Sequence, residues 1–250
     1  MAGHDLSKRI VYHVDGMRNV RVKRDVYKRD AGAELAINVY APASLSGGAR
    51  LPAVVFVHGG PIPADFQPPT QWGVFVSYGE LAAASGLVGV TFNHRLFAME
   101  DFDRAQADVT AAIDYVRSHA TELNVDAERI ALWYFSGGGL LMMPMMLDRP
   151  DYVRCMLAFY AYLQPVEMQV RTKGAGLPIF IARAGLDQRM INDTIDLFVQ
   201  EALAGNAMLD VMNHPAGRHG FDMLDDDERS REIIARAVAF AQVHVRRSDR

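Results

Sequence analysis

Short apolar runs alternate with helical patterns along most of the chain, and this alternation constrains the fold more than any other feature. The segment AVVFVHGG, which begins at Ala53, is apolar on both faces, as is typical of a strand buried in a parallel sheet. Amphipathic patterns such as DRAQADVTAAIDYVRSHATEL, which begins at Asp103, lie between such runs. Strands that alternate with helices indicate βαβ units, so the sequence predicts an α/β fold with a mainly parallel sheet.

The first two strand patterns differ from the others. Residues 20–29 and 34–42 alternate apolar and polar side chains and predict an antiparallel pair. Together with the later runs they give about eight strands. Residues 77–86, SYGELAAASG, predict a helix that Gly86 ends. No break in composition divides the chain, so we expect residues 1–250 to form a single domain.

Composition excludes several classes of function. With 50% hydrophobic residues, 22% charged residues and a net charge of −4, the chain has the balance of a soluble globular protein and lacks a basic footprint for nucleic acid. The sequence has neither a signal-like apolar run at its start nor a membrane-spanning segment, so we expect a cytoplasmic protein. The lone Cys155 excludes an internal disulfide and is predicted to be a buried structural thiol. No His/Cys cluster has the spacing of a metal site, and we expect no cofactor.

Three serines carry an S-x-G pattern, namely Ser46, Ser77 and Ser136. Ser46 belongs to a glycine-rich surface turn. Ser77 is a rival nucleophile, but the apolar run before it begins thirteen residues after Gly60, which leaves no room for a crossover helix. We therefore interpret Ser77 as an N-cap or first-turn serine. Ser136 follows the strand pattern RIALWYF and precedes three glycines and a helical pattern.

This arrangement predicts a nucleophile elbow, in which a strained turn lifts the serine hydroxyl above the sheet and small neighbours let the helix approach the strand. Tyr134, however, stands where G-x-S-x-G has its first glycine. Its side chain must point away from the contact between helix and strand, or the helix must lie further from the strand. A ring that fills the space around Ser136 would instead favour a site without catalysis.

Four motifs occur in a characteristic order: VHGG after a strand, NVDAERIALWYFSGGG around Ser136, ARAGLDQ at a later strand end, and GRHGF near the C-terminus. Over about two thirds of its length the chain resembles the α/β-hydrolase superfamily, most closely its small carboxylesterase and dienelactone-hydrolase-like members. The resemblance implies an eight-stranded, mostly parallel sheet with helices on both faces. Residues 161–177 are too few for a large cap domain, so we expect a minimal cap.

Members of the superfamily carry a triad in the order serine, acid, histidine, which implies Ser136, Asp187 and His219. A serine hydroxyl needs a base to accept its proton, and His219 is the candidate base because glycines flank it. Asp187 would fix the tautomer of the imidazole and stabilise the imidazolium. His214 stays open as an alternative base. Asp222 and Asp193 are reserve candidates for the acid.

The resemblance also implies an oxyanion hole made of backbone amides. The expected donors are the amides of Gly137 and Gly60, with Gly59 as a further candidate, whereas Pro61 has no N–H to offer. We expect His58 to hold the loop and Arg95 to form a structural ion pair. The candidates for a substrate-binding wall come from the two long irregular pieces, residues 61–72 and 161–177, and from the elbow: Phe66, Trp72, Tyr134, Met142 and Tyr162.

These residues favour a serine hydrolase that cleaves small carboxylic esters through an acyl-enzyme on Ser136. An aminopeptidase-like enzyme is an alternative, since HGGP resembles such members. A lactone hydrolase is another, although dienelactone hydrolases usually have cysteine at the elbow. The third alternative is a binding protein without catalysis. We expect a small-molecule ester as the partner, rather than nucleic acid or a membrane, and the sequence leaves a homodimer open.

Overall fold

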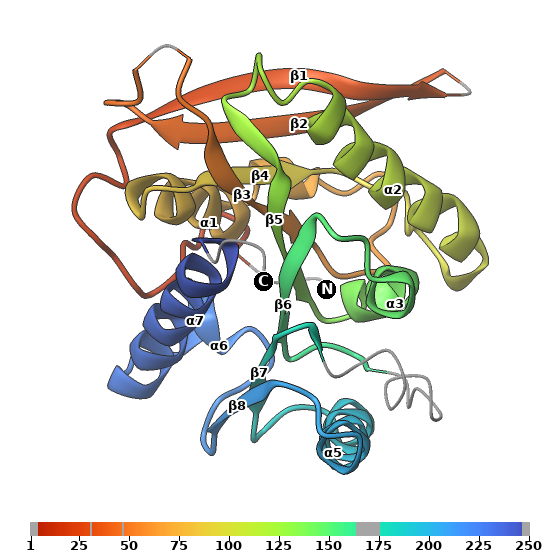
Figure 1. The fold of residues 1–250 in the computed structure, drawn as a ribbon. Helices are drawn as coiled ribbons and strands as arrows, with labels where there is room; N and C mark the ends of the chain where they lie inside the picture. Colours follow the sequence, from red (N-terminus) through yellow and green to blue (C-terminus); the bar gives the residue numbers. More distant parts are fainter. Residues whose placement is uncertain (1–4, 31, 47, 164–175, 247–250) are drawn as a thin grey trace.

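A computed structural model of the chain describes residues 5–30, 32–46, 48–163 and 176–246, in which eight strands form one sheet. The order of the strands is β1-β2-β4-β3-β5-β6-β7-β8 (Figure 1). Their bounds are Val20–Asp30 (β1), Ala33–Pro42 (β2), Leu51–Val57 (β3), Val88–Phe92 (β4), Val125–Phe135 (β5), Val153–Phe159 (β6), Ile179–Ala184 (β7) and Leu209–His214 (β8).

The direction of the strands agrees with the sequence patterns. β1 pairs antiparallel with β2, and β2 pairs antiparallel with β4. All other neighbours run parallel, from the pair β3–β4 to the pair β7–β8. The predictions of an antiparallel pair at the start and of an eight-stranded, mostly parallel sheet are confirmed.

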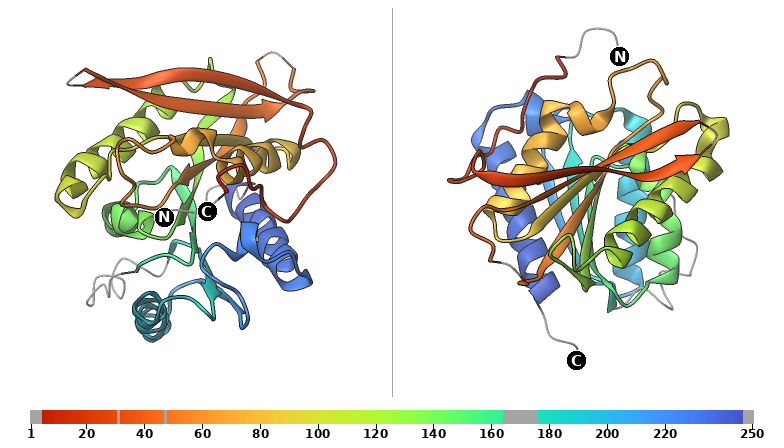
Figure 2. Two further views of the ribbon diagram at one scale, coloured as in Figure 1. Left: turned by 180° about the vertical axis from the view of Figure 1, so that it is seen from behind. Right: turned by 90° about the horizontal axis from the view of Figure 1, so that it is seen from above.

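Helices cover both faces of the sheet. Figure 1 and Figure 2 show α1, α6 and α7 on one face and α2, α3 and α5 on the other. Two single turns of 3-10 helix complete the described elements. The helices are Gly73–Ala84 (α1), Phe102–Ser118 (α2), Gly138–Asp148 (α3), Arg189–Ala204 (α5), Phe221–Leu224 (α6) and Glu228–Arg246 (α7), and the 3-10 turns are Pro69–Gln71 (η1) and Met99–Asp101 (η2). Within the described residues, no helix combines the length and apolar character needed to cross a membrane.

The helix expected from residue 77 begins four residues earlier, at Gly73, and this corrects the interpretation of Ser77. The apolar residues before Ser77 belong to the helix itself, because Val74 and Phe75 pack into the core on its buried side. Ser77 therefore lies inside α1 and is fully buried. Its hydroxyl donates to the carbonyl of Val74 at 2.9 Å and accepts from the amide of Ile10 at 3.0 Å.

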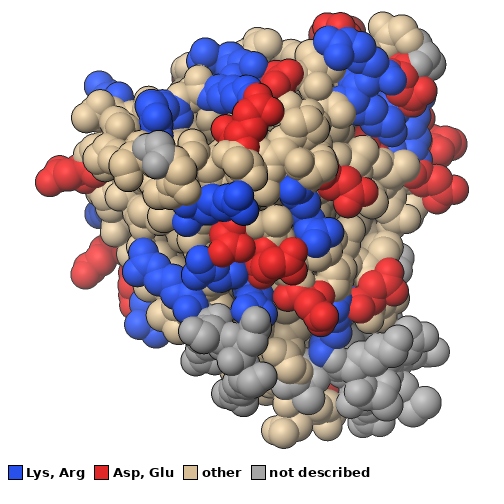
Figure 3. All heavy atoms as spheres, turned by 45° about the horizontal axis from the view of Figure 1, so that its top comes forward, with Lys and Arg blue, Asp and Glu red and all other residues tan. Residues whose placement is uncertain are grey.

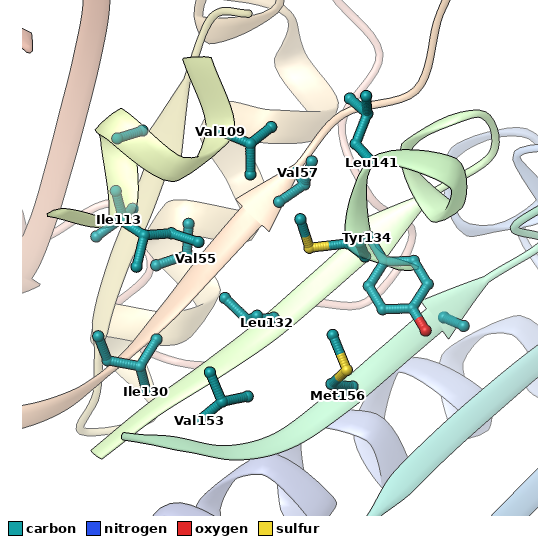
Figure 4. Packing of buried hydrophobic residues seen from close by; sticks show 14 of the residues in the cluster. Val55, Val57, Val109, Ile113, Ile130, Leu132, Tyr134, Leu141, Val153 and Met156 are labelled. Atoms are coloured by element: carbon teal, nitrogen blue, oxygen red, sulfur yellow. The ribbon is translucent and has the colours of Figure 1, made fainter. Parts of the chain in front are cut away.

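β5 separates two hydrophobic clusters, because successive side chains of a strand point to opposite faces. Figure 4 shows Ile130, Leu132 and Tyr134 in the cluster beneath α2 and α3. Trp133 and Phe135 point the other way, into the cluster beneath α1 and α7. Ser136 follows β5 directly, so it lies between these two clusters, one on each face of the sheet.

Ion pairs connect β1, at the edge of the sheet, to Arg95 after β4 and to Asp108 of α2. Figure 3 shows cationic and anionic side chains close together on the face over these strands. Arg95, which follows β4, donates to both carboxylate oxygens of the buried Asp108 at 2.7 and 2.8 Å and to Asp30 of β1 at 2.7 Å. Lys28 of β1 also binds Asp108, at 2.8 Å. The predicted structural ion pair of Arg95 is confirmed.

Candidate active site

Ser136 occupies a sharp turn between β5 and α3. Its backbone φ is 51°, in the left-handed region that residues with a side chain rarely adopt. The carbonyl of Ser136 accepts from the amides of Gly139 and Tyr162 at 3.1 and 3.0 Å, and its own amide donates to Phe159 at 3.2 Å. These three hydrogen bonds hold the strained conformation, which is the geometry expected of a nucleophile elbow.

The three glycines after Ser136 allow backbone to touch backbone. A Cβ atom at Gly137 would lie 2.2 Å from the carbonyl oxygen of Gly60, and one at Gly138 would lie 2.7 Å from that of His58. At Gly139 the same atom would lie 2.2 Å from the carbonyl oxygen of Tyr162. A side chain does not fit at any of the three positions, so the turn and the start of α3 pack directly against the chain that follows β3 and the chain that follows β6.

Tyr134 does not take part in this contact. Its ring is completely buried in the cluster that also holds Leu141 and Met156 (Figure 4). The space around Ser136 is thus not filled by the ring. The prediction that Tyr134 binds substrate is wrong, because the second residue before the serine points to the face of the sheet away from the cavity described below.

A chain of hydrogen bonds connects the three residues expected to form the triad. His219 Nε2 lies 3.0 Å from Ser136 Oγ, and His219 Nδ1 lies 2.8 Å from Asp187 Oδ2. The side chain of Asp187 is fully buried, and its second oxygen accepts from the amide of Gln188 at 2.7 Å. A base between a hydroxyl and a carboxylate is the arrangement that activates a serine.

The loops that carry the acid and the base are joined to each other. The amide of Leu186, next to Asp187, donates to the carbonyl of Gly217 at 2.9 Å. Gly185 allows this approach, because a Cβ there would lie 2.4 Å from the carbonyl oxygen of Pro215. The ends of β7 and β8 thereby hold Asp187 and His219 in a fixed relation.

The structure places the reserve candidates elsewhere. His214 is buried, and its Nε2 lies 3.0 Å from Ser230 Oγ and 3.2 Å from Asp227. Asp193 lies on α5 and pairs with Arg189 at 3.5 Å. None of these contacts involves Ser136.

Asp222, the other reserve acid, accepts two hydrogen bonds from tyrosines. Tyr78 and Tyr160 donate to its two oxygens at 2.6 and 2.8 Å, and burial raises the pKa of the Asp222 carboxyl. The ring of Tyr160 lies 4.7 Å from that of His219, measured between centroids. Asp222 therefore binds Tyr160, whose ring lies beside the imidazole, and does not bind the imidazole itself.

The loop after β3 is held by two stacked histidines. The rings of His58 and His94 lie 3.5 Å apart and nearly parallel. His58 Nδ1 lies 2.6 Å from the carbonyl oxygen of Gly59, and the amide of His94 donates to His58 Nε2 at 3.3 Å. Burial lowers the pKa of both rings, that of His94 to about 4, so both are neutral at pH 7. The expectation that His58 holds the loop is confirmed.

This loop brings the expected oxyanion donors beside the elbow. The amide nitrogen of Gly60 lies 3.2 Å from the point where a Cβ of Gly137 would stand. Within the described residues, neither the Gly60 amide nor the Gly137 amide is paired with a backbone acceptor. Two amides are therefore free at the place where the resemblance puts an oxyanion hole.

A cavity of about 660 Å³ opens at Ser136 and His219. Gly59 and Gly60 line it, as do Phe66 and Trp72, which were expected in its wall. Met142 is fully buried in the core, so its expected place in the wall is wrong, since the helix turns that side chain towards the sheet. Tyr162 is not among the described residues that line the cavity.

Sequence reasoning missed part of the cavity wall. Among the residues it missed are Leu6, Phe75, Phe135, Tyr160 and Met223, together with the charged Asp5, Lys8 and Arg218. The alternation of β5 was a usable signal for Phe135, because the residue directly before Ser136 points to the face opposite Tyr134. Among the described residues, no group of three or more His, Cys, Asp or Glu is arranged to hold a metal ion.

Residues 37–150 match the model of the BD-FAE family, which is an α/β-hydrolase family. Carboxylesterase 3 of Pongo abelii is 29% identical over 125 residues, which are 46% of this chain and 21% of that protein. The chain thus spans about a fifth of the length of this relative.

The structure is similar to that of the thermophilic esterase Est2 from the planctomycete Thermogutta terrifontis. The native form has a TM-score of 0.72 at 24% identity and covers 90% of this chain and 92% of that one. A propionate-bound form of the same esterase has a TM-score of 0.74 at 22% identity, with coverage of 94% and 98%. A form phosphoramylated by tabun has a TM-score of 0.70 at 22% identity, with coverage of 91% and 94%. The order of the sheet, the elbow and these likenesses agree that the chain has the α/β-hydrolase fold, and residues 37–150 are similar to an α/β-hydrolase family.

Proposed function

We propose that this chain is a serine hydrolase that cleaves small carboxylic esters through an acyl-enzyme on Ser136. The observation that carries the proposal is the unbroken series of hydrogen bonds from Asp187 through His219 to Ser136, at the wall of an open cavity. The names of the relatives, carboxylesterase 3 and esterase 2, support the same class of reaction.

The geometry supports a reaction in two halves. Ser136 Oγ attacks the ester carbonyl while His219 Nε2 accepts its proton, and Asp187 stabilises the imidazolium. The carbonyl oxygen, now negative, accepts hydrogen bonds from the amides of Gly60 and Gly137. As the tetrahedral intermediate collapses, His219 returns the proton to the leaving alcohol. A water molecule then attacks the acyl-enzyme by the same route and releases the acid.

The aromatic part of the cavity wall supports a substrate with an apolar acyl or alkyl group. Phe66, Trp72, Phe75 and Phe135 line the cavity, to which Asp5, Lys8 and Arg218 add charged side chains. Trp72 is fixed, because its indole N–H donates to the carbonyl of Gln67 at 2.7 Å. We therefore place a short acyl or alkyl ester in the cavity, and we retain a cytoplasmic location and a small-molecule partner as parts of the proposal.

The test is the hydrolysis of p-nitrophenyl acetate and butyrate by wild type and Ser136→Ala. Removal of the nucleophile is expected to lower kcat by about 10⁴-fold or more. Ser118→Ala is a matched control at an exposed helix end, and we expect it to keep the wild-type rate. A fluorophosphonate probe should label the folded wild type at Ser136. Equal rates in wild type and Ser136→Ala would refute the proposal.

The same assay separates the other hydrolase classes. Aminoacyl anilides and lactones are compared with the esters at equal concentration. We expect the highest kcat/KM for open-chain esters, because aromatic side chains line the cavity and Asp5, a carboxylate of its wall, already accepts hydrogen bonds from Ser7. A higher kcat/KM for anilides or lactones would show that the same mechanism acts on an amide or a cyclic ester. Failure of every substrate and of the probe would favour a binding protein without catalysis.

A further inference from the structure

One wall of the cavity comes from a segment far from the triad in sequence. Residues 5–12, here called the N-terminal strap, run past the start of α1. Leu6 and Lys8 of the strap line the cavity together with Trp72. The side chain of Leu6 is half-buried, and it brings apolar surface to the cavity beside the loop after β3.

Backbone contacts hold the strap to α1. The amide of Gly73 donates to the carbonyl of Leu6 at 2.7 Å. A Cβ at Gly73 would lie 2.2 Å from the carbonyl oxygen of Ser7, so the strap crosses the helix at a point where only glycine fits. The first residue of α1 is therefore shaped to receive Leu6 and its neighbour.

The rest of the strap is held by buried groups. The amide of Ile10, whose side chain is buried, donates to Ser77 Oγ at 3.0 Å. The next amide, that of Val11, donates to the carbonyl of Asp222 at 2.8 Å. This explains Ser77, which the sequence singled out as a rival nucleophile: its hydroxyl is used to bind the strap.

We propose that Leu6 is a specificity-determining residue, which the strap holds at a fixed position so that it limits the size of the apolar group that the cavity accepts. The inference rests on the proposed ester hydrolysis and concerns the same cavity. The bonds to Gly73 and Ser77 prevent Leu6 from moving aside when a longer chain enters. A shorter side chain at position 6 lengthens the cavity, and a larger one shortens it.

The test compares kcat/KM for p-nitrophenyl acetate, butyrate, hexanoate and octanoate, and for acetate esters of alcohols of increasing length. In at least one of the two series, Leu6→Ala should raise the ratio of the longest to the shortest ester by about 3- to 10-fold, and Leu6→Trp should lower it by a similar factor. Leu203→Ala, the same change at an exposed position of α5, should leave the ratio unchanged.

Ser77→Ala tests the strap without a change in the cavity wall. Loss of the bond to Ile10 should loosen the strap, raise the same ratio and accelerate amide hydrogen exchange at Ile10. A merely structural role would lower kcat/KM for all esters by one factor and leave the ratio unaltered.

Ratios that stay at the wild-type value in Leu6→Ala, Leu6→Trp and Ser77→Ala overturn the inference. Failure of the proposed function gives a different result, because the hydrolysis of every ester, whatever its length, would then proceed at the same rate in wild type and Ser136→Ala.

Discussion

The two sides of the elbow obey different steric rules. On the helix side, Gly137 and Gly138 pack against backbone carbonyls at distances that exclude even a methyl group. On the strand side, Tyr134 stands two residues before Ser136 and carries a large ring into the core. The G-x-S-x-G pattern has glycine at the positions of Tyr134 and Gly138, yet only the helix side requires glycine here.

The difference follows from the direction of each side chain. A Cβ at Gly137 would point at the loop after β3, which carries Gly60, an expected oxyanion donor. The side chain of Tyr134 points along the opposite face of β5, where Leu141 and Met156 leave room for a ring (Figure 4). A missing glycine on the strand side is thus not evidence of a disused site.

Of the changes that test this contrast, Gly137→Ala is expected to have the largest effect. The added methyl group must displace the carbonyl of Gly60 and, with it, the neighbouring amide donor, so kcat/KM for p-nitrophenyl acetate should fall by about 10²- to 10³-fold. Gly176→Ala is the matched control, because no atom of the described residues lies within 4 Å of a Cβ at that position. If Gly137→Ala kept wild-type kcat/KM while Gly176→Ala did the same, the contrast between the two sides would be wrong.

The second prediction concerns the histidines that hold the loop on the helix side. Burial lowers the pKa of His94 to about 4, whereas an unfolded histidine titrates near about 6.5. Between these values the unfolded chain binds the extra proton, so the free energy of unfolding should fall as the pH falls from about 6.5 to about 4. The loss attributable to His94 is roughly 3 kcal/mol.

Urea denaturation of wild type and His94→Gln over this pH window measures the effect. The variant should show a shallower dependence on pH, whereas His13→Gln, at an exposed position, should keep the wild-type slope. Identical slopes in wild type and His94→Gln would contradict the assignment of a neutral, buried ring.

The smallest effect is expected on the strand side. The hydroxyl of Tyr134 is buried without a hydrogen-bond partner in the described residues, so Tyr134→Phe should raise the free energy of unfolding by about 1 kcal/mol and leave kcat unchanged. Tyr160→Phe makes the same chemical change where the hydroxyl binds Asp222, and it should destabilise by about 1 kcal/mol. Denaturant titration of both variants tests the pair, and a loss of kcat in Tyr134→Phe would place its ring at the site after all.

The sequence was sufficient for the sheet and for the elements that bring the candidate triad together. Short runs that are apolar on both faces, such as residues 53–57, are typical of strands in a covered parallel sheet. The order of the motifs around Ser136, Asp187 and His219 then implied a site that hydrogen bonds connect in the structure.

The misplacements share a cause, which is that sequence spacing does not give the direction of a side chain. Met142 was expected in the cavity because it is near Ser136 in sequence, but the helix turns it into the core. Ser77 was placed at a helix start because the apolar residues before it, among them Val74 and Phe75, have the pattern of a strand. In the structure these residues form the first turn of α1. Leu6 could not be found at all, since its contact with Gly73 joins segments that no local pattern relates.

Cys155 makes the protein suitable for labelling at a single introduced cysteine. It is the sole cysteine of the sequence, it is completely buried in β6, and burial raises the pKa of its thiol. A thiolate is the reactive form, so maleimide dyes and spin labels should leave the wild-type chain unmodified. A cysteine introduced on the exposed side of the strap would then be the single attachment point for a reporter, without any background cysteine to remove.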